Sequence, residues 1–199
     1  MRYRKYAAQV QRVFRRLDRQ IAAFQKAAQL RCSPGCGECC RSPEVEATVL
    51  EMLPAGLRLW QTGRLQEWLD RLSQKEMPEV CIFFIEHPAA PAAGHCSVYP
   101  WRPLSCRLFG FSAMVDREGC SELVSCRLIK QDRAQVAAVA AEAVRRGAVA
   151  VPLMREYAMG MYRLDPSLGS TLQPINLALR QALERIGFHL QHMRGLGLR

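Results

Sequence analysis

The sequence predicts a mostly α-helical protein, in which a helical domain is interrupted by an irregular cysteine-rich insert with a few short strands. Three observations predict this class. Apolar residues recur at steps of three and four on both sides of the middle of the chain, which is the period of a helix face. Between residues 77 and 126 that period disappears and five prolines interrupt the chain. All nine cysteines lie between Cys32 and Cys126.

The first element is a basic amphipathic helix over residues 5–31. Residues 1–31 hold nine Lys and Arg against the single acid Asp18, a net +8 of the +10 carried by the chain. Such asymmetry marks either a surface for an acidic partner or nucleic acid, or a solvated helix face. We favour the solvated face, because Phe14 and Phe24 fall on the apolar stripe and do not alternate with the arginines. That stripe consists of Val10, Val13, Phe14, Leu17, Ile21 and Phe24.

The cysteine region covers residues 32–126 and begins with four cysteines in nine residues. Pro34, Gly35 and Gly37 break regular helix there and allow a tight loop. We expect a second helix with Ser42 as its N-cap, ending at Pro54, and a third over about residues 63–76. Residues 81–85 read as a strand or a buried turn, and residues 116–119 as a turn between two extended pieces.

Residues 127–199 again show helical periodicity, with three helices. The first ends at Gly147, the second begins at Pro152, and the last begins at Pro174. Their apolar faces consist of Val136, Val139, Ala140, Ala143 and Val144; Leu153, Tyr157 and Met161; and Ile175, Leu179, Leu183, Ile186 and Leu190. With 49% hydrophobic residues in 199, the chain is long enough to bury a core, and we expect a single domain over residues 1–199.

The clustered cysteines predict a metal site rather than disulfides. Disulfides need an oxidising compartment, and residues 1–31 show neither an apolar signal segment nor a cleavage site, so we expect a cytoplasmic protein with reduced thiols and no membrane span. Thiolates suit iron–sulfur clusters and zinc. Cys36 and Cys39 have the CxxC spacing that places two sulfurs on one metal. Cys39 and Cys40 are adjacent, and in extended backbone they would face apart, which predicts two centres or one multi-iron cluster.

Four thiolates leave negative charge that needs cations nearby. We expect Arg102 and Arg107 to supply them at the cofactor, since Trp101 and two prolines stiffen that segment. His87 and His95 lie within the cysteine region and are candidate replacements for a thiolate. His189 and His192, three apart on the last helix, have a spacing that would make half of a metal site.

A long motif in this region resembles a known family. The segment Cys36-Gly37-Glu38-Cys39-Cys40 is followed at a distance by Cys96-Ser97-Val98-Tyr99-Pro100-Trp101-Arg102-Pro103-Leu104-Ser105-Cys106-Arg107-Leu108-Phe109. Together they resemble the YkgJ-like cysteine-cluster family, whose domain is described as chelating zinc or iron. The resemblance implies eight chelating cysteines: Cys32, Cys36, Cys39, Cys40, Cys81, Cys96, Cys106 and Cys126. Cys120 is then the extra cysteine that does not chelate, although Cys120 and Cys126 could exchange these roles. A related motif occurs in flagellin lysine methylase, which extends the analogy to protein modification.

The function we predict is metal binding through about eight cysteines, with an iron–sulfur cluster of the 4Fe–4S type as cofactor and zinc as the alternative. Such a centre would serve redox or protein-modification chemistry. A small cluster-dependent enzyme is the competing hypothesis, because Cys32, Cys36 and Cys39 have the spacing of the radical S-adenosylmethionine motif. That class requires a series of β/α units after the motif, and the sequence shows none. A zinc-stabilised module that binds a protein partner is the third hypothesis, and nucleic acid is the less favoured partner.

Overall fold

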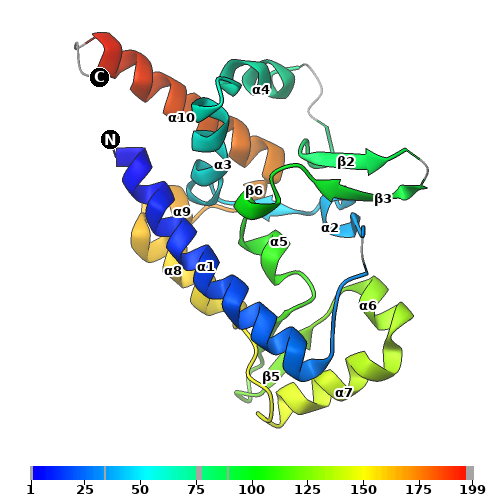
Figure 1. Cartoon of the computed structure of the whole chain (residues 1–199). Coiled ribbons are helices and arrows are strands. Elements are labelled where there is room, and N and C mark those ends of the chain that lie inside the picture. Colours follow the sequence, from blue (N-terminus) through cyan, green and yellow to red (C-terminus); the bar gives the residue numbers. More distant parts are fainter. Residues whose placement is uncertain (1, 34, 75–77, 89, 196–199) are drawn as a thin grey trace.

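A computed structural model of the chain describes residues 2–33, 35–74, 78–88 and 90–195. The protein is mostly helical with a few short strands, as predicted (Figure 1). The helices are α1 (Arg2–Ala28), α2 (Glu38–Arg41), α3 (Val49–Gln61), α4 (Leu65–Leu72), α5 (Leu104–Leu108), α6 (Arg127–Asp132), α7 (Ala134–Arg145), α8 (Met154–Leu164), α9 (Pro166–Gly169) and α10 (Ile175–Gly195), with a 3₁₀ turn at Tyr99–Trp101. The strands are β1 (Glu46–Ala47), β2 (Phe84–His87), β3 (Ala90–Cys96), β4 (Ser112–Val115), β5 (Ser121–Val124) and β6 (Gln173–Pro174).

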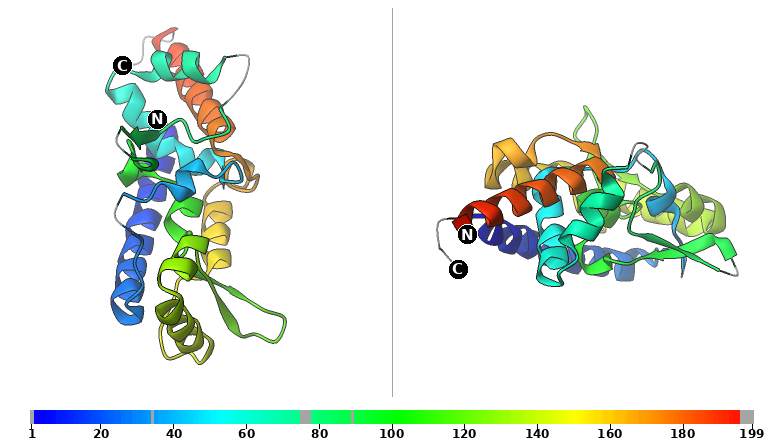
Figure 2. Two further views of the ribbon diagram at one scale, coloured as in Figure 1. Left: turned by 90° about the vertical axis from the view of Figure 1, so that its right-hand side faces the viewer. Right: turned by 90° about the horizontal axis from the view of Figure 1, so that it is seen from above.

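The core is centred on α3, which packs against both α1 and α10. The predicted apolar stripe of α1 is buried at Val10, Phe14 and Leu17, and it continues through Ile21 and Phe24. The basic side chains of α1 lie on the opposite, exposed face. In both views of Figure 2 this helix runs along one side of the molecule. Because this apolar stripe is buried over most of its length, α1 is held in place and other segments pack against it.

The second helix begins later than predicted and runs through Pro54. Thr48 is its N-cap: the Thr48 hydroxyl accepts the Glu51 N–H at 3.3 Å, and the Glu51 carboxylate accepts the Thr48 N–H at 2.8 Å. This reciprocal capping box is a stronger start signal than Ser42. Pro54 lies inside the helix, where its missing N–H leaves only the carbonyl one turn earlier without its usual partner. Burial of the whole segment from Val49 to Leu57 therefore outweighs the local preference of proline.

The strands form three two-stranded antiparallel sheets among the described residues, β1 with β6, β2 with β3, and β4 with β5. The described part of the chain accordingly shows no series of parallel β/α units of the kind the radical enzyme class requires. The turn predicted at residues 116–119 joins β4 to β5, with Gly119 at a φ of +87°. In the run of residues 81–85, Phe84 and Ile85 begin β2, and the three residues before them form a turn.

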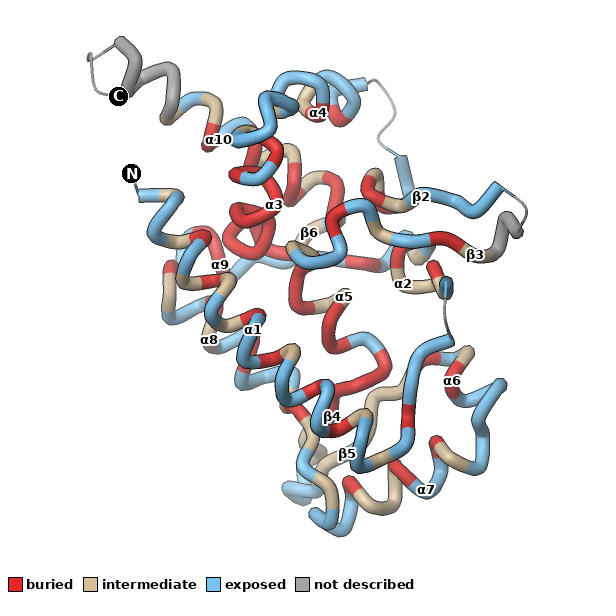
Figure 3. Tube along the Cα trace, in the orientation of Figure 1, coloured by how far each residue is buried: buried red, intermediate tan, exposed pale blue. Residues whose placement is uncertain are grey.

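The C-terminal helices follow the predicted faces except in α7. Val139 is 66% exposed, and α7 instead buries Ala137, Ala140 and Val144. Figure 3 shows how buried and exposed positions mix along α7. The last helix buries Ile175, Leu179, Leu183 and Ile186 as predicted, while the side chains of Leu190 and His192 lie outside the described residues. The third helix ends at Leu72, and residues 75 and 76 of its predicted span are likewise not described. None of the helices described has the length and apolar character that crossing a membrane requires.

Candidate metal centre

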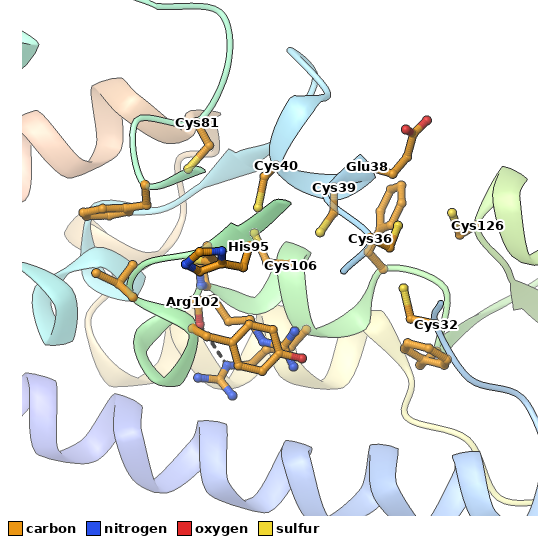
Figure 4. Close-up of a pocket in the computed structure, with 18 of the residues that line it drawn as sticks. Cys32, Cys36, Glu38, Cys39, Cys40, Cys81, His95, Arg102, Cys106 and Cys126 are labelled. Carbon is orange, nitrogen blue, oxygen red and sulfur yellow. Dashed lines mark hydrogen bonds between the residues drawn. The ribbon is translucent and has the colours of Figure 1, made fainter. Parts of the chain in front are cut away.

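One cavity of about 530 Å³ gathers the side chains that the sequence singled out (Figure 4). All eight predicted cysteines line it, together with Arg102, Arg107 and His95. They come from five separate stretches of chain, namely the loop before α2, α2 itself, the segment before β2, the segment from β3 to α5, and the start of α6. Cys120 is exposed in the turn between β4 and β5, whereas Cys126 is buried at the cavity. His87 lies in the exposed β2–β3 hairpin and is not part of the lining.

The cysteine loop is fixed against the β2–β3 hairpin. The N–H of Gly94 in β3 donates to the carbonyl of Gly35 at 2.9 Å, and Cys36 forms an antiparallel bridge with Ala93. A Cβ atom on either Gly37 or Gly94 would lie 2.3 Å from the Phe84 ring, so glycine is required where the two backbones approach. The hairpin register in turn pairs Phe84 with Cys96. The hairpin therefore sets the position of Cys96 and of the loop that carries Cys36.

The expectation that Cys39 and Cys40 face apart was wrong. Both lie in the short helix α2, where neighbouring side chains are about 100° apart rather than opposite, as the 3.6-residue period requires. The two thiols shift each other's pKa, and Cys40 and Cys96 do the same, so all three lie close together. The adjacent pair therefore lines one cavity.

The eight thiols form two neighbouring groups. We use the name inner group for Cys39, Cys40, Cys81, Cys96 and Cys106, and the name outer group for Cys32, Cys36 and Cys126. Electrostatic interactions link Cys81 and Cys106 to Cys39 and Cys96 within the inner group. In the outer group Cys32 interacts with Cys36 and Cys126, and it also interacts with Cys39 of the inner group. In Figure 4 the labelled members of each group lie on opposite sides of the cavity, with Cys39 between. Across the described ranges, no three Cys, His, Asp or Glu side chains already converge on one ion.

Arg102 is a cation that acts on Cys39 and Cys96 of the inner group. Its guanidinium lies 3.9 Å from the Tyr99 ring centre, and its Nε is buried without a hydrogen-bond partner among the described residues. The hydrogen bond with Cys40 lowers the pKa of the Cys39 thiol to about 7, and the charge of Arg102 acts in the same direction. The pKa of Cys96 is lowered by the same two residues, with the Cys40 hydrogen bond as the larger cause. Thiolate therefore forms most readily beside Arg102.

The other inner thiols hold their protons. Burial raises the pKa of Cys81 to about 12 and also raises the pKa of Cys106, while the hydrogen bond with Cys39 is the main cause of the raised pKa of Cys40. A metal ion that binds here must displace those protons, since thiolate is the form that coordinates. Burial is also the main reason that the pKa of the outer thiol Cys32 is raised to about 12.

Arg107, whose side chain also lines the cavity, makes its hydrogen bonds to other groups of the protein. Its side chain is 2% exposed and lies 4.3 Å from the Phe14 ring centre. It donates to the carbonyls of Pro100 and Arg102, at 2.7 and 2.8 Å, and to the Asp18 carboxylate of α1. Arg107 therefore ties the turn that carries Arg102 to the long helix.

Sequence reasoning missed two buried polar residues that hold the cysteine segments. The Glu51 carboxylate, whose pKa is raised by burial, accepts the Leu104 N–H at 2.8 Å and so joins α3 to the helix that carries Cys106. Asn176 of α10 binds the segment that carries Cys81. The capping-box pattern was a signal for Glu51, whereas no local pattern distinguishes Asn176.

Eight thiols lining one cavity of a helical scaffold define a class of protein that binds metal through cysteine. A family model named CxxCxxCC, with the description "Putative zinc- or iron-chelating domain", matches residues 31–139. The match covers more than half of the chain, and the chain belongs to this family, which confirms the resemblance seen in the sequence. Searches among curated proteins and among solved structures gave no match. Helices α1, α8, α9 and α10 lie outside the matched residues.

Proposed function

We propose that the inner group holds an iron–sulfur cluster of the 4Fe–4S type, in a reducing, cytoplasmic setting. The carrying observation is the inner group itself: five thiols spread around a cavity of about 530 Å³ that is also lined by Arg102. A structural zinc site is closed, with four ligands meeting at one ion, whereas a multi-iron cluster needs ligands around a larger volume.

The residues fit such a group by donor chemistry. Cys39 and Cys96 supply the most acidic thiols of the inner group, and Arg102 offsets their charge. Cys81, before β2, and Cys106, in α5, line the same cavity. Apolar side chains such as Phe83 also line it and limit the access of water. When bound, the cluster supplies one-electron transfer or an open iron for a ligand. The chain's own residues then set its charge and its access to solvent.

Metal analysis of protein purified without oxygen tests this proposal. We expect a broad brown absorption with iron and acid-labile sulfide. Cys81→Ser and Cys106→Ser should lose most of the metal, whereas Cys120→Ser, in the exposed turn, is the matched control and should retain it. Cys32→Ser separates one centre from two, because loss of only part of the metal indicates a second centre at the outer group. Protein free of both iron and zinc after metal-replete, reducing expression contradicts the proposal.

Zinc is the second candidate, and the Cys36-x-x-Cys39 spacing favours it. It predicts colourless protein with stoichiometric zinc and no spectral response to dithionite, because zinc has no redox chemistry. An enzyme is distinguished from a binding module by two further measurements on the loaded protein, reduction by dithionite and binding of S-adenosylmethionine. A module that serves a protein partner should show neither response.

A further inference from the structure

Asn176 makes three hydrogen bonds to one short segment of backbone. It lies in the first turn of α10 and is 3% exposed. Its Nδ2 donates to the carbonyls of Pro78 and Val80, at 2.7 and 2.9 Å, and its Oδ1 accepts the Ile82 N–H at 2.9 Å. These three hydrogen bonds therefore fall on the two sides of Cys81.

Burial and other hydrogen bonds hold the C-terminal end of this segment, where Phe83 is 2% exposed and its carbonyl accepts the Ser97 N–H at 2.9 Å. Residues 78–83 belong to no helix or strand, so their polar backbone groups need partners from elsewhere. The Cys81 N–H donates to the Cys40 carbonyl at 3.0 Å, which joins the segment directly to α2. The neighbouring residue on α10, Ile175, lines the cavity and donates its N–H to Val45 at 3.0 Å. The start of α10 is thus fixed beside the cysteines.

We infer that Asn176 is a positioning residue that holds Cys81 in the inner group, although it lies outside the residues matched by the family model. An amide is required chemically, because the segment presents two carbonyls and one N–H to it. Aspartate keeps the acceptor but turns a carboxylate toward two carbonyl oxygens, and alanine leaves all three groups without a partner. The inference about Cys81 as a ligand rests on the proposed function; the inference about its position does not.

Alkylation of the reduced, metal-free full chain tests the position. The rate at each cysteine is followed by peptide mass spectrometry in Asn176→Ala, Asn176→Asp and the wild type. We expect Cys81 to react about tenfold faster in both variants, because local opening exposes a thiol that is now 5% exposed. Cys106 and Cys126, which are held by other segments, should stay within about twofold of the wild type.

Gln181→Ala is the matched control, because Gln181 is a polar residue of the same helix whose side chain pairs with Gln173, at 3.2 Å, and, among the described residues, not with the segment that carries Cys81. It should leave Cys81 protected. Asn176→Ser, which keeps one donor and one acceptor, is the milder variant should the others fail to fold, and it should give an intermediate rate. Unchanged Cys81 reactivity overturns the inference, and so does an equal increase at every cysteine, which indicates general loosening.

The same variants separate this inference from the proposed function. After anaerobic reconstitution with iron and sulfide, the Asn176 variants should lose as much metal as Cys81→Ser. If the wild type takes up no metal while Cys81 still becomes reactive in the variants, the proposed function fails and the positioning role stands. If the wild type loads normally and Cys81 stays protected in every variant, the positioning role fails alone.

Discussion

Replacing Arg107 by methionine should destabilise the metal-free protein by about 3 kcal/mol, the balance of lost hydrogen bonds and retained apolar contacts. The two donations to Pro100 and Arg102 come from a charged group, and such hydrogen bonds contribute about 1.5–3 kcal/mol each. The contact with Asp18 adds less, about 0.2–1 kcal/mol, because that carboxylate is 44% exposed. Methionine keeps some packing on Phe14, which limits the loss.

Urea unfolding of reduced, metal-free protein measures this change. Arg127→Met is the matched control, since Arg127 is 74% exposed and has one contact, with Glu38 at 3.2 Å; it should change stability by less than about 0.5 kcal/mol. Asp18→Asn should cost less than about 1 kcal/mol. The reasoning is refuted if Arg107→Met costs under about 1 kcal/mol, or no more than Asp18→Asn, because the two carbonyl contacts would then contribute nothing.

Two further predictions concern backbone packing and pH. Gly94→Ala should lower the free energy of unfolding by about 1–3 kcal/mol, because the new Cβ would overlap the Phe84 ring. Gly160→Ala, in open space on α8, should raise it by about 0.5–1 kcal/mol. Urea unfolding measures both changes. Asp165 caps α9, and although burial disfavours its charged form, hydrogen bonds led by that of Ser167 hold its pKa well below the usual value. Its stabilisation is present above the unfolded pKa of about 3.9 and is lost as the pH falls further, so Asp165→Asn should be less stable than the wild type at neutral pH and lose that difference in acid.

The sequence predicted the elements whose signals are local. The stripe of α1 and the buried face of α10 follow from apolar periodicity, and the turn before β5 follows from Asp116 and Gly119. The predicted start of α3 was wrong because Ser42 and Pro43 were taken as the helix N-terminus, whereas the capping box of Thr48 and Glu51 is the stronger local signal. Packing of α3 against α1 and α10 accounts for its continuation through Pro54, and no local pattern records that packing.

The site was predictable in its membership and not in its arrangement. Thiol chemistry and the family motif named the side chains that line the cavity, but the direction of Cys40 depended on whether residues 38–41 are helical. The choice between Cys120 and Cys126 depended on which one reaches the cavity, a question of tertiary contact. Asn176 is separated from Ile82 by 94 positions, which places its role beyond any local pattern.

Metal removal tests whether the irregular cysteine-rich segment needs its metal to stay ordered, because metal–ligand bonds can take the place of a hydrophobic core. Residues 77–126 contribute buried apolar side chains to the one hydrophobic core, among them Phe83, Leu104, Leu108, Phe111 and Ala113. We therefore expect the chelated, reduced protein to keep its far-ultraviolet circular dichroism and to lose only the stability linked to binding, about 2.7 kcal/mol with free metal at 100 times its Kd.

Leu108→Ala is the comparison for this experiment. Leu108 is 2% exposed, and its truncation should cost the metal-free protein about 2–5 kcal/mol. If burial orders the segment, Leu108→Ala weakens the chelated protein while chelation alone leaves the helical signal intact. Collapse of that signal on chelation, with little added effect of Leu108→Ala, would mean that sulfur–metal bonds and not apolar contacts hold residues 77–126 in place.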